Sequence, residues 1–170
     1  RDMAPTGANL LCVGGDIEGY TPLSRLADAE DTRPLADETS GSSLLYSSGT
    51  TGYPKGIRRP LTGEAIDVYP ARYHSFRDRY DFSTDTVYLS PAPLYHAAPL
   101  GFTMATMAFG GTVIVMERFD ALKALENIER YTVTHSQWVP TMFIRMLRLE
   151  LSDREKFDLS SHRVAIHAAA

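Results

Sequence analysis

One short segment contains the residue types that are needed to bind phosphate. It runs from Tyr46 to Gly56 and reads YSSGTTGYPKG. Glycines let backbone N–H groups converge on phosphate oxygens without Cβ clashes, hydroxyls add hydrogen bonds, and a lysine supplies a mobile positive charge. The segment therefore predicts a polyphosphate-binding loop, although a polar hairpin loop without a ligand has a similar composition. The candidate binding residues are Ser47, Ser48, Gly49, Thr50, Thr51, Gly52 and Lys55.

The spacing of this segment differs from that of the P-loop of nucleotide kinases. The P-loop requires Gly-x-x-x-x-Gly-Lys-Ser/Thr, with the lysine directly after the second glycine. Here Lys55 lies three residues after Gly52. Any phosphate binding by this loop is therefore of another kind.

A second segment, residues 89–99 (LSPAPLYHAAP), contains an apolar strand that ends in a proline-rich turn. The turn contains an aromatic–histidine pair, Tyr95 and His96. A histidine in such a turn is as often a solvated or core residue as a ligand contact, so the residue type alone leaves both open.

The segment from Tyr46 to Gly56 closely resembles the signature of the adenylate-forming superfamily. This superfamily comprises acyl-CoA synthetases, the adenylation domains of peptide synthetases, and luciferases. Every position of the signature is met, with Ser47 where threonine is more common. Residues 89–99 resemble the next family motif, and residues 138–142 and 164–170 resemble later ones. The resemblance implies that the loop wraps the β- and γ-phosphates of ATP, and that Lys55 and His96 act in catalysis.

The resemblance also implies a reaction and its cofactors. A carboxylic acid and ATP form an acyl-adenylate and pyrophosphate, and a thiol, usually coenzyme A, then takes the acyl group, with Mg²⁺ required. The family's magnesium-binding Tyr-Gly-x-Thr-Glu motif and its C-terminal lid domain have no counterpart in this sequence. We therefore expect residues 1–170 to be a single incomplete α/β domain, an internal segment of the family's large N-terminal domain.

Apolar runs alternate with helix-compatible segments along the chain. Strands are predicted at residues 9–13, 43–47, 57–59, 86–90, 112–116, 132–137 and 163–167. Helices are predicted in the first half of residues 21–41 and at 70–80, 100–109, 121–131 and 141–150, with Asp120 as an N-cap. This alternation predicts an α/β fold with a mostly parallel sheet that is flanked by helices on both faces. Because ligand loops follow the carboxyl ends of such strands, we expect the phosphate loop at that edge.

Composition excludes several functional classes. Lys and Arg number 17 against 21 Asp and Glu, a net charge of −4, so nothing indicates a nucleic-acid partner. The apolar stretches fall short of the ~20 residues that a membrane helix needs. The single cysteine, Cys12, excludes an internal disulfide and fits a reducing, cytoplasmic compartment. Since Cys12 lies in an apolar run, we expect a buried structural thiol.

The sequence leaves alternatives open for the acid that is activated and for the thiol that accepts the acyl group. Residues 56–61 resemble fatty-acid- or steroid-acid-CoA ligases more than amino-acid adenylation domains. Small side chains after His96, at Gly101, Ala105 and Ala108, could leave room beside Leu100 for a bulky apolar acid. The alternatives are a peptide-synthetase adenylation domain that feeds a carrier protein, and a non-catalytic nucleotide-binding module.

Residues 1–170 alone should not catalyse adenylation, because the family's metal-binding glutamate and lid lysine are not among them. The measurement is acid-dependent ATP–pyrophosphate exchange by the 170-residue chain. Detectable exchange would contradict this expectation.

Overall fold

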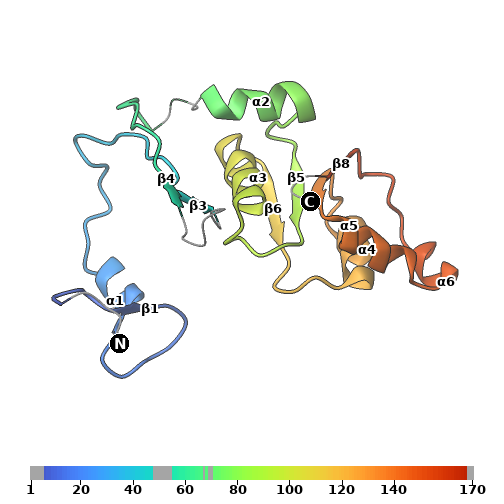
Figure 1. Ribbon diagram of the computed structural model, residues 1–170, viewed down its shortest axis with the longest axis horizontal. Coiled ribbons are helices and arrows are strands. Elements are labelled where there is room, and N and C mark those ends of the chain that lie inside the picture. Colours follow the sequence, from blue (N-terminus) through green and yellow to red (C-terminus); the bar gives the residue numbers. More distant parts are fainter. Residues whose placement is uncertain (1–5, 48–54, 67, 69–70, 168–170) are drawn as a thin grey trace. The chain divides into compact units, whose positions relative to one another are not determined.

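The computed structural model describes residues 6–47, 55–66, 68 and 71–167. The chain forms two compact units, residues 1–38 and 39–170 (Figure 1). In the first unit, β1 (Leu11–Cys12) pairs in parallel with β2 (Thr21–Pro22), and α1 (Leu23–Ala27) follows directly. The Cys12 thiol is buried and donates to the Gly15 carbonyl oxygen at 3.2 Å. The expectation of a buried thiol is therefore confirmed.

The second unit contains a four-stranded parallel sheet in the order β6-β5-β7-β8. Its strands are β5 (Val87–Ser90), β6 (Thr112–Val115), β7 (His135–Trp138) and β8 (Val164–His167). Its helices are α2 (Ala71–Tyr80), α3 (Ala97–Ala108), α4 (Ala121–Arg130), α5 (Pro140–Leu147) and α6 (Leu151–Arg154).

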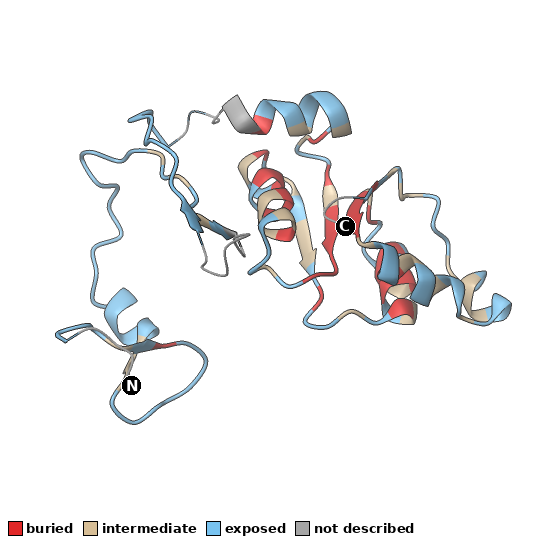
Figure 2. Ribbon diagram, viewed as in Figure 1, coloured by how far each residue is buried: buried red, intermediate tan, exposed pale blue. Residues whose placement is uncertain are grey.

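Helices cover both faces of this sheet. Successive side chains of β5 point to opposite faces, so Tyr88 packs with Phe102 of α3 while Leu89 packs with Ala124 of α4 and Met142 of α5. Burial follows the same arrangement and is concentrated in the central strands and the inner sides of the helices (Figure 2). The predicted α/β fold with a parallel sheet flanked by helices is confirmed.

The strand before the phosphate loop does not belong to this sheet. β3 (Leu45–Ser47) pairs antiparallel with β4 (Lys55–Ile57), and the two form a separate two-stranded sheet. The expectation that the loop lies at the carboxyl edge of the parallel sheet was therefore wrong. A connection of seven residues can join two antiparallel neighbours, whereas parallel neighbours need a crossover of a dozen or more residues.

Several element boundaries differ from the predicted ones for local reasons. Helix α3 begins three residues early, at Ala97, because Pro99 falls in its first turn, where the missing N–H costs nothing. The helix predicted over 141–150 is shorter, because α5 ends at Leu147; Glu150, which is extended (φ −56°, ψ 148°), is the N-cap residue of the separate helix α6. The strand predicted from residue 132 begins at His135, because Thr132 has a left-handed φ of 52° after α4.

Two predicted helix boundaries are confirmed in detail. The Asp120 side chain accepts a hydrogen bond from the Lys123 backbone N–H at 2.8 Å and so caps α4. Gly110 follows α3 with φ 77°, the left-handed conformation of a C-cap signal. The next residue, Gly111, passes so close to β5 that a Cβ there would lie 2.7 Å from the Thr86 carbonyl oxygen.

A histidine network joins the elements at the amino edge of the sheet. His135 Nε2 lies 2.7 Å from the Tyr80 carbonyl oxygen, which can only accept, so Nε2 carries the proton. The Thr134 hydroxyl lies 2.7 Å from the other ring nitrogen, Nδ1. His162 Nε2 lies 2.6 Å from the Ser136 hydroxyl. Burial lowers the pKa of both His135 and His162.

These lowered pKa values should make the folded chain less stable in mild acid. Below the ordinary histidine pKa of 6.5, the unfolded state binds protons that the folded state does not. The free energy of unfolding should therefore be highest above pH 6.5. It should decrease as the pH falls below 6.5. Urea denaturation between pH 7.5 and 5.5, above the main titration of carboxylates, measures this decline.

The matched variant is His162→Gln, which removes one of the two titrating groups and keeps a side chain of similar size. Its decline in stability over the same range should be smaller than that of the wild-type chain. An identical pH dependence in the two proteins would contradict the assignment to these histidines.

Candidate functional site

The β3–β4 hairpin brings two predicted phosphate-binding residues opposite each other. Ser47 and Lys55 are register partners at the ends of the two strands. The other candidates, Ser48, Gly49, Thr50, Thr51 and Gly52, lie outside the described residues. The Lys55 side chain is exposed, and no ion pair involves it in the described part of the chain. Its ammonium group is thus available to an anion at the end of the hairpin.

Packing within the hairpin explains two further positions of the signature. Tyr46 and Gly56 are register partners, and a Cβ at Gly56 would lie 3.3 Å from the Tyr46 ring. The glycine therefore lets the aromatic ring lie over the neighbouring strand. This contact fixes the register that places Lys55 opposite Ser47.

The parallel sheet has a topological switch point between β5 and β7. From β5 the chain passes through α3 to β6, which lies on one side of β5. Strand β7, which precedes α5, lies on the other side of β5. Helices α3 and α5 cover opposite faces. In sheets of this kind, ligands bind in the crevice outside the carboxyl ends of the strands at the switch point.

His96 lies next to this crevice. It is the N-cap residue of α3, at the end of the loop that follows β5, and its exposed ring lies 4.4 Å from the ring of Tyr95. Lys55 lies on a different sheet, and no hydrogen bond or ion pair between described residues joins Lys55 to His96. The structure therefore places the two predicted catalytic residues on separate elements, and their joint action remains a prediction.

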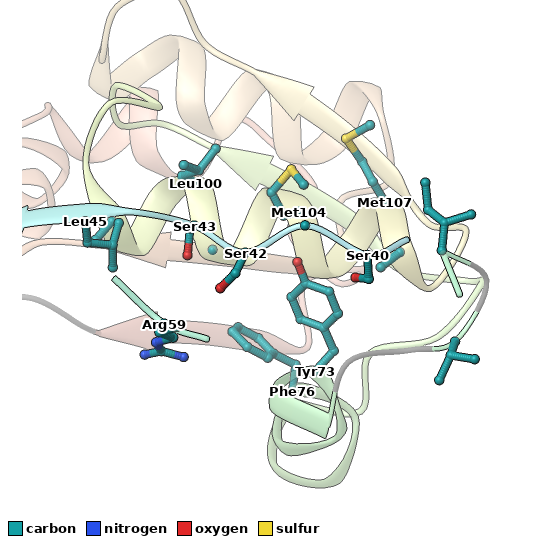
Figure 3. A pocket seen from close by; sticks show the side chains of 16 residues that line it. Ser40, Ser42, Ser43, Leu45, Arg59, Tyr73, Phe76, Leu100, Met104 and Met107 are labelled. Carbon is teal, nitrogen blue, oxygen red and sulfur yellow. The ribbon is translucent and has the colours of Figure 1, made fainter. Parts of the chain in front are cut away.

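An apolar groove of about 990 Å³ lies along the outer side of α3 (Figure 3). Leu100, Met104 and Met107 of α3 form one wall, and the aromatic rings of Tyr73 and Phe76 come from α2. The opposite side is formed by the segment before β3, by the first residue of β3 and by one residue after β4; these residues are Ser40, Gly41, Ser42, Ser43, Leu45 and Arg59. The volume is at the upper end of the range of small-molecule sites.

The sequence indicated part of this groove. Leu100, Gly101 and Ala108 line it as expected, but Ala105 is fully buried against the sheet. Ala105 lies on the inner side of α3, where it belongs to the same core cluster as Phe102, one turn before it. The aromatic side of the groove was missed, although the spacing of Tyr73 and Phe76 by three residues puts them on one face of α2.

The structure combines a doubly wound parallel sheet that has a switch-point crevice with a glycine- and hydroxyl-rich hairpin that carries an exposed lysine. This is the architecture of an α/β enzyme that binds its ligands at loops. Comparison with known families identifies one family: the model of the AMP-binding enzyme family matches residues 9–170. The chain belongs to the AMP-binding enzyme family.

Individual relatives agree with this family. The chain is 34% identical over 156 residues to 4-coumarate-CoA ligase 1 of Narcissus pseudonarcissus, with 91% of this chain and 28% of the relative covered. The N-terminal domain of FACL13 from Mycobacterium tuberculosis, solved with an inhibitor, is 26% identical, with a TM-score of 0.67 and coverage of 89% of this chain and 38% of that one. ATP-bound MatB from Rhodopseudomonas palustris is 27% identical with a TM-score of 0.58, covering 81% and 25%.

Proposed function

We propose that this chain is part of an ATP-dependent acid–coenzyme A ligase that activates its acid as an acyl-adenylate. The chain spans 28% of the 4-coumarate-CoA ligase that it matches, so the proposal concerns the whole enzyme to which these residues belong. The observation that carries it is the Tyr46–Gly56 signature in a hairpin that puts Lys55, which forms no ion pair with the described residues, opposite Ser47.

In the first step, a carboxylate oxygen of the acid attacks the α-phosphorus of ATP. A bond forms between this oxygen and phosphorus, and the bond from phosphorus to the oxygen that bridges to the β-phosphate breaks, so pyrophosphate leaves. Catalysis of such a step is mainly positioning and charge stabilisation. Lys55 would offset the charge that develops on the leaving pyrophosphate, and His96 would lie near the carboxylate.

Magnesium and coenzyme A enter this proposal through the family. Within the described ranges, no group of three or more His, Cys, Asp or Glu side chains could hold a metal ion.

The buried thiol of Cys12 supports a reducing compartment such as the cytoplasm. No helix in the described part of the chain is long and apolar enough to cross a membrane.

We further propose that the acid is apolar and bulky, of the fatty or steroid kind. The groove along α3 supports this, because it begins beside His96 at Ala97 and continues to Ala108. Twelve helical residues span about 18 Å, which is the length of a long acyl chain. The flexible side chains of Met104 and Met107 adapt readily to an apolar ligand.

Replacement of Lys55 by alanine in the full-length enzyme should slow adenylate formation on the order of 100-fold, because one preorganised positive group at the leaving pyrophosphate is lost. The measurement is ATP–pyrophosphate exchange with 4-coumarate, 4-hydroxybutyrate, hexadecanoate and cholate as acids. The control is Lys123→Ala on α4, which removes a lysine that pairs with Glu126 at the surface. Equal rates for the wild type and Lys55→Ala would remove Lys55 from this role.

Filling the groove should weaken binding of a long acid. A Cβ at Gly101 meets no atom within 4 Å, so Gly101→Leu can enter the groove without a backbone clash. We expect the KM for hexadecanoate to rise about tenfold while the KM for ATP stays constant. Gly101→Ala, which adds a single methyl group, should have a much smaller effect. An unchanged hexadecanoate KM in Gly101→Leu would show that the acid does not use the groove.

A further inference from the structure

A row of aromatic rings follows the carboxyl edge of the parallel sheet. Phe119, after β6, lies 6.3 Å from Trp138 at the end of β7, and Trp138 lies 6.0 Å from Phe143 on α5. Phe143 lies 6.3 Å from the ring of His167 at the end of β8. These separations are within the range of favourable ring contacts. The row thus ends in a titratable side chain at the edge where ligands bind.

The strand register determines the side of the sheet on which His167 lies. His167 is the register partner of Trp138 in the parallel pair β7–β8, so the two side chains point to the same face. Trp138 belongs to the core under α4 and α5. The neighbouring residue Ile166 points to the other face and is 4% exposed, whereas His167 is exposed.

The imidazole of His167 contacts the ring of Phe143. In the part of the chain that the structure describes, no hydrogen bond or ion pair involves its ring nitrogens. His135 of β7 and His162, which precedes β8, differ in this respect, since both have ring nitrogens within 2.7 Å of a polar partner. Among the described residues, His167 therefore keeps free hydrogen-bonding capacity at the carboxyl edge of the sheet, one strand beyond the switch point.

His167 and His96 flank the end of β7. β7 lies between β5 and β8 in the sheet. The ends of β5 and β8 are therefore about 10 Å apart, twice the spacing of neighbouring strands. His96 follows β5 on the side of α3, and His167 ends β8 on the side of α5. A small group bound outside the end of β7 would lie between the chain segments that carry these two histidines.

We propose that His167 is a second histidine of the acid-binding site, whose imidazole N–H donates a hydrogen bond to the carboxylate of the acid from the side opposite His96. Phe143 is then a positioning residue, because its ring contact orients the imidazole. The inference rests on the proposed acid-activating function and names a residue that recognises the substrate of that function. No covalent step is assigned to His167; its role is to align the carboxylate oxygen for attack on the α-phosphorus.

The test measures KM values in ATP–pyrophosphate exchange by the full-length enzyme, with the best acid among 4-coumarate, 4-hydroxybutyrate, hexadecanoate and cholate. We expect His167→Ala to raise the KM for the acid about tenfold, the cost of losing one hydrogen bond to a charged group, without changing the KM for ATP. His167→Gln keeps an N–H donor and should recover part of the loss. Phe143→Leu keeps the bulk of the side chain and should give an intermediate KM.

The matched control is His74→Ala, which removes an exposed histidine from α2. Because His167 is exposed, its variants should keep the circular dichroism spectrum of the wild type. If exchange occurs but the acid KM of His167→Ala equals that of His74→Ala, or if the ATP KM rises in parallel, the inference fails while the proposed function stands. If no acid in the panel supports exchange, both fail.

Discussion

The second unit depends on the pairing of β5, which is hydrogen-bonded to a parallel strand on each side and buried on both faces. Tyr88 and Leu89 are both fully buried and belong to different cores. A strand in this position must be covered by helices on both faces, since neither face can be left to water. The chain leaves β5 for β6 on one side and later continues from β7 to β8 on the other side, and this change creates the switch point and the crevice beside His96.

The β3–β4 hairpin is a two-stranded sheet separate from that strand. Its register comes from the packing of Tyr46 over Gly56 and from three pairs of antiparallel neighbours. The hairpin presents Lys55, whereas His96 caps α3 and His167 ends β8. In the proposed reaction, the phosphates and the acid would bind to these different parts of the protein and meet at the reacting atoms.

Local sequence patterns predicted the elements well wherever a local cause determines them. The cap at Asp120 and the left-handed Gly110 follow from side-chain and backbone preferences that act over a few residues. Predictions were wrong where a residue depends on its neighbours in space. Helix α5 ends at Leu147 rather than at residue 150, β7 begins only after Thr132, and Ala105 packs inward although its small size suggested the groove.

The sequence by itself determined the family and predicted which residues would bind phosphate, because eleven consecutive positions match the signature of a loop whose chemistry is local. It also determined the α/β class, because apolar strands that alternate with helices can be buried only in a sheet covered on both faces. Only the tertiary structure decided that the hairpin stands outside the parallel sheet. It alone also placed His167 in an aromatic row beside Phe143 and opened the groove on the outer side of α3, because strand order and ring contacts depend on segments that are distant in the sequence.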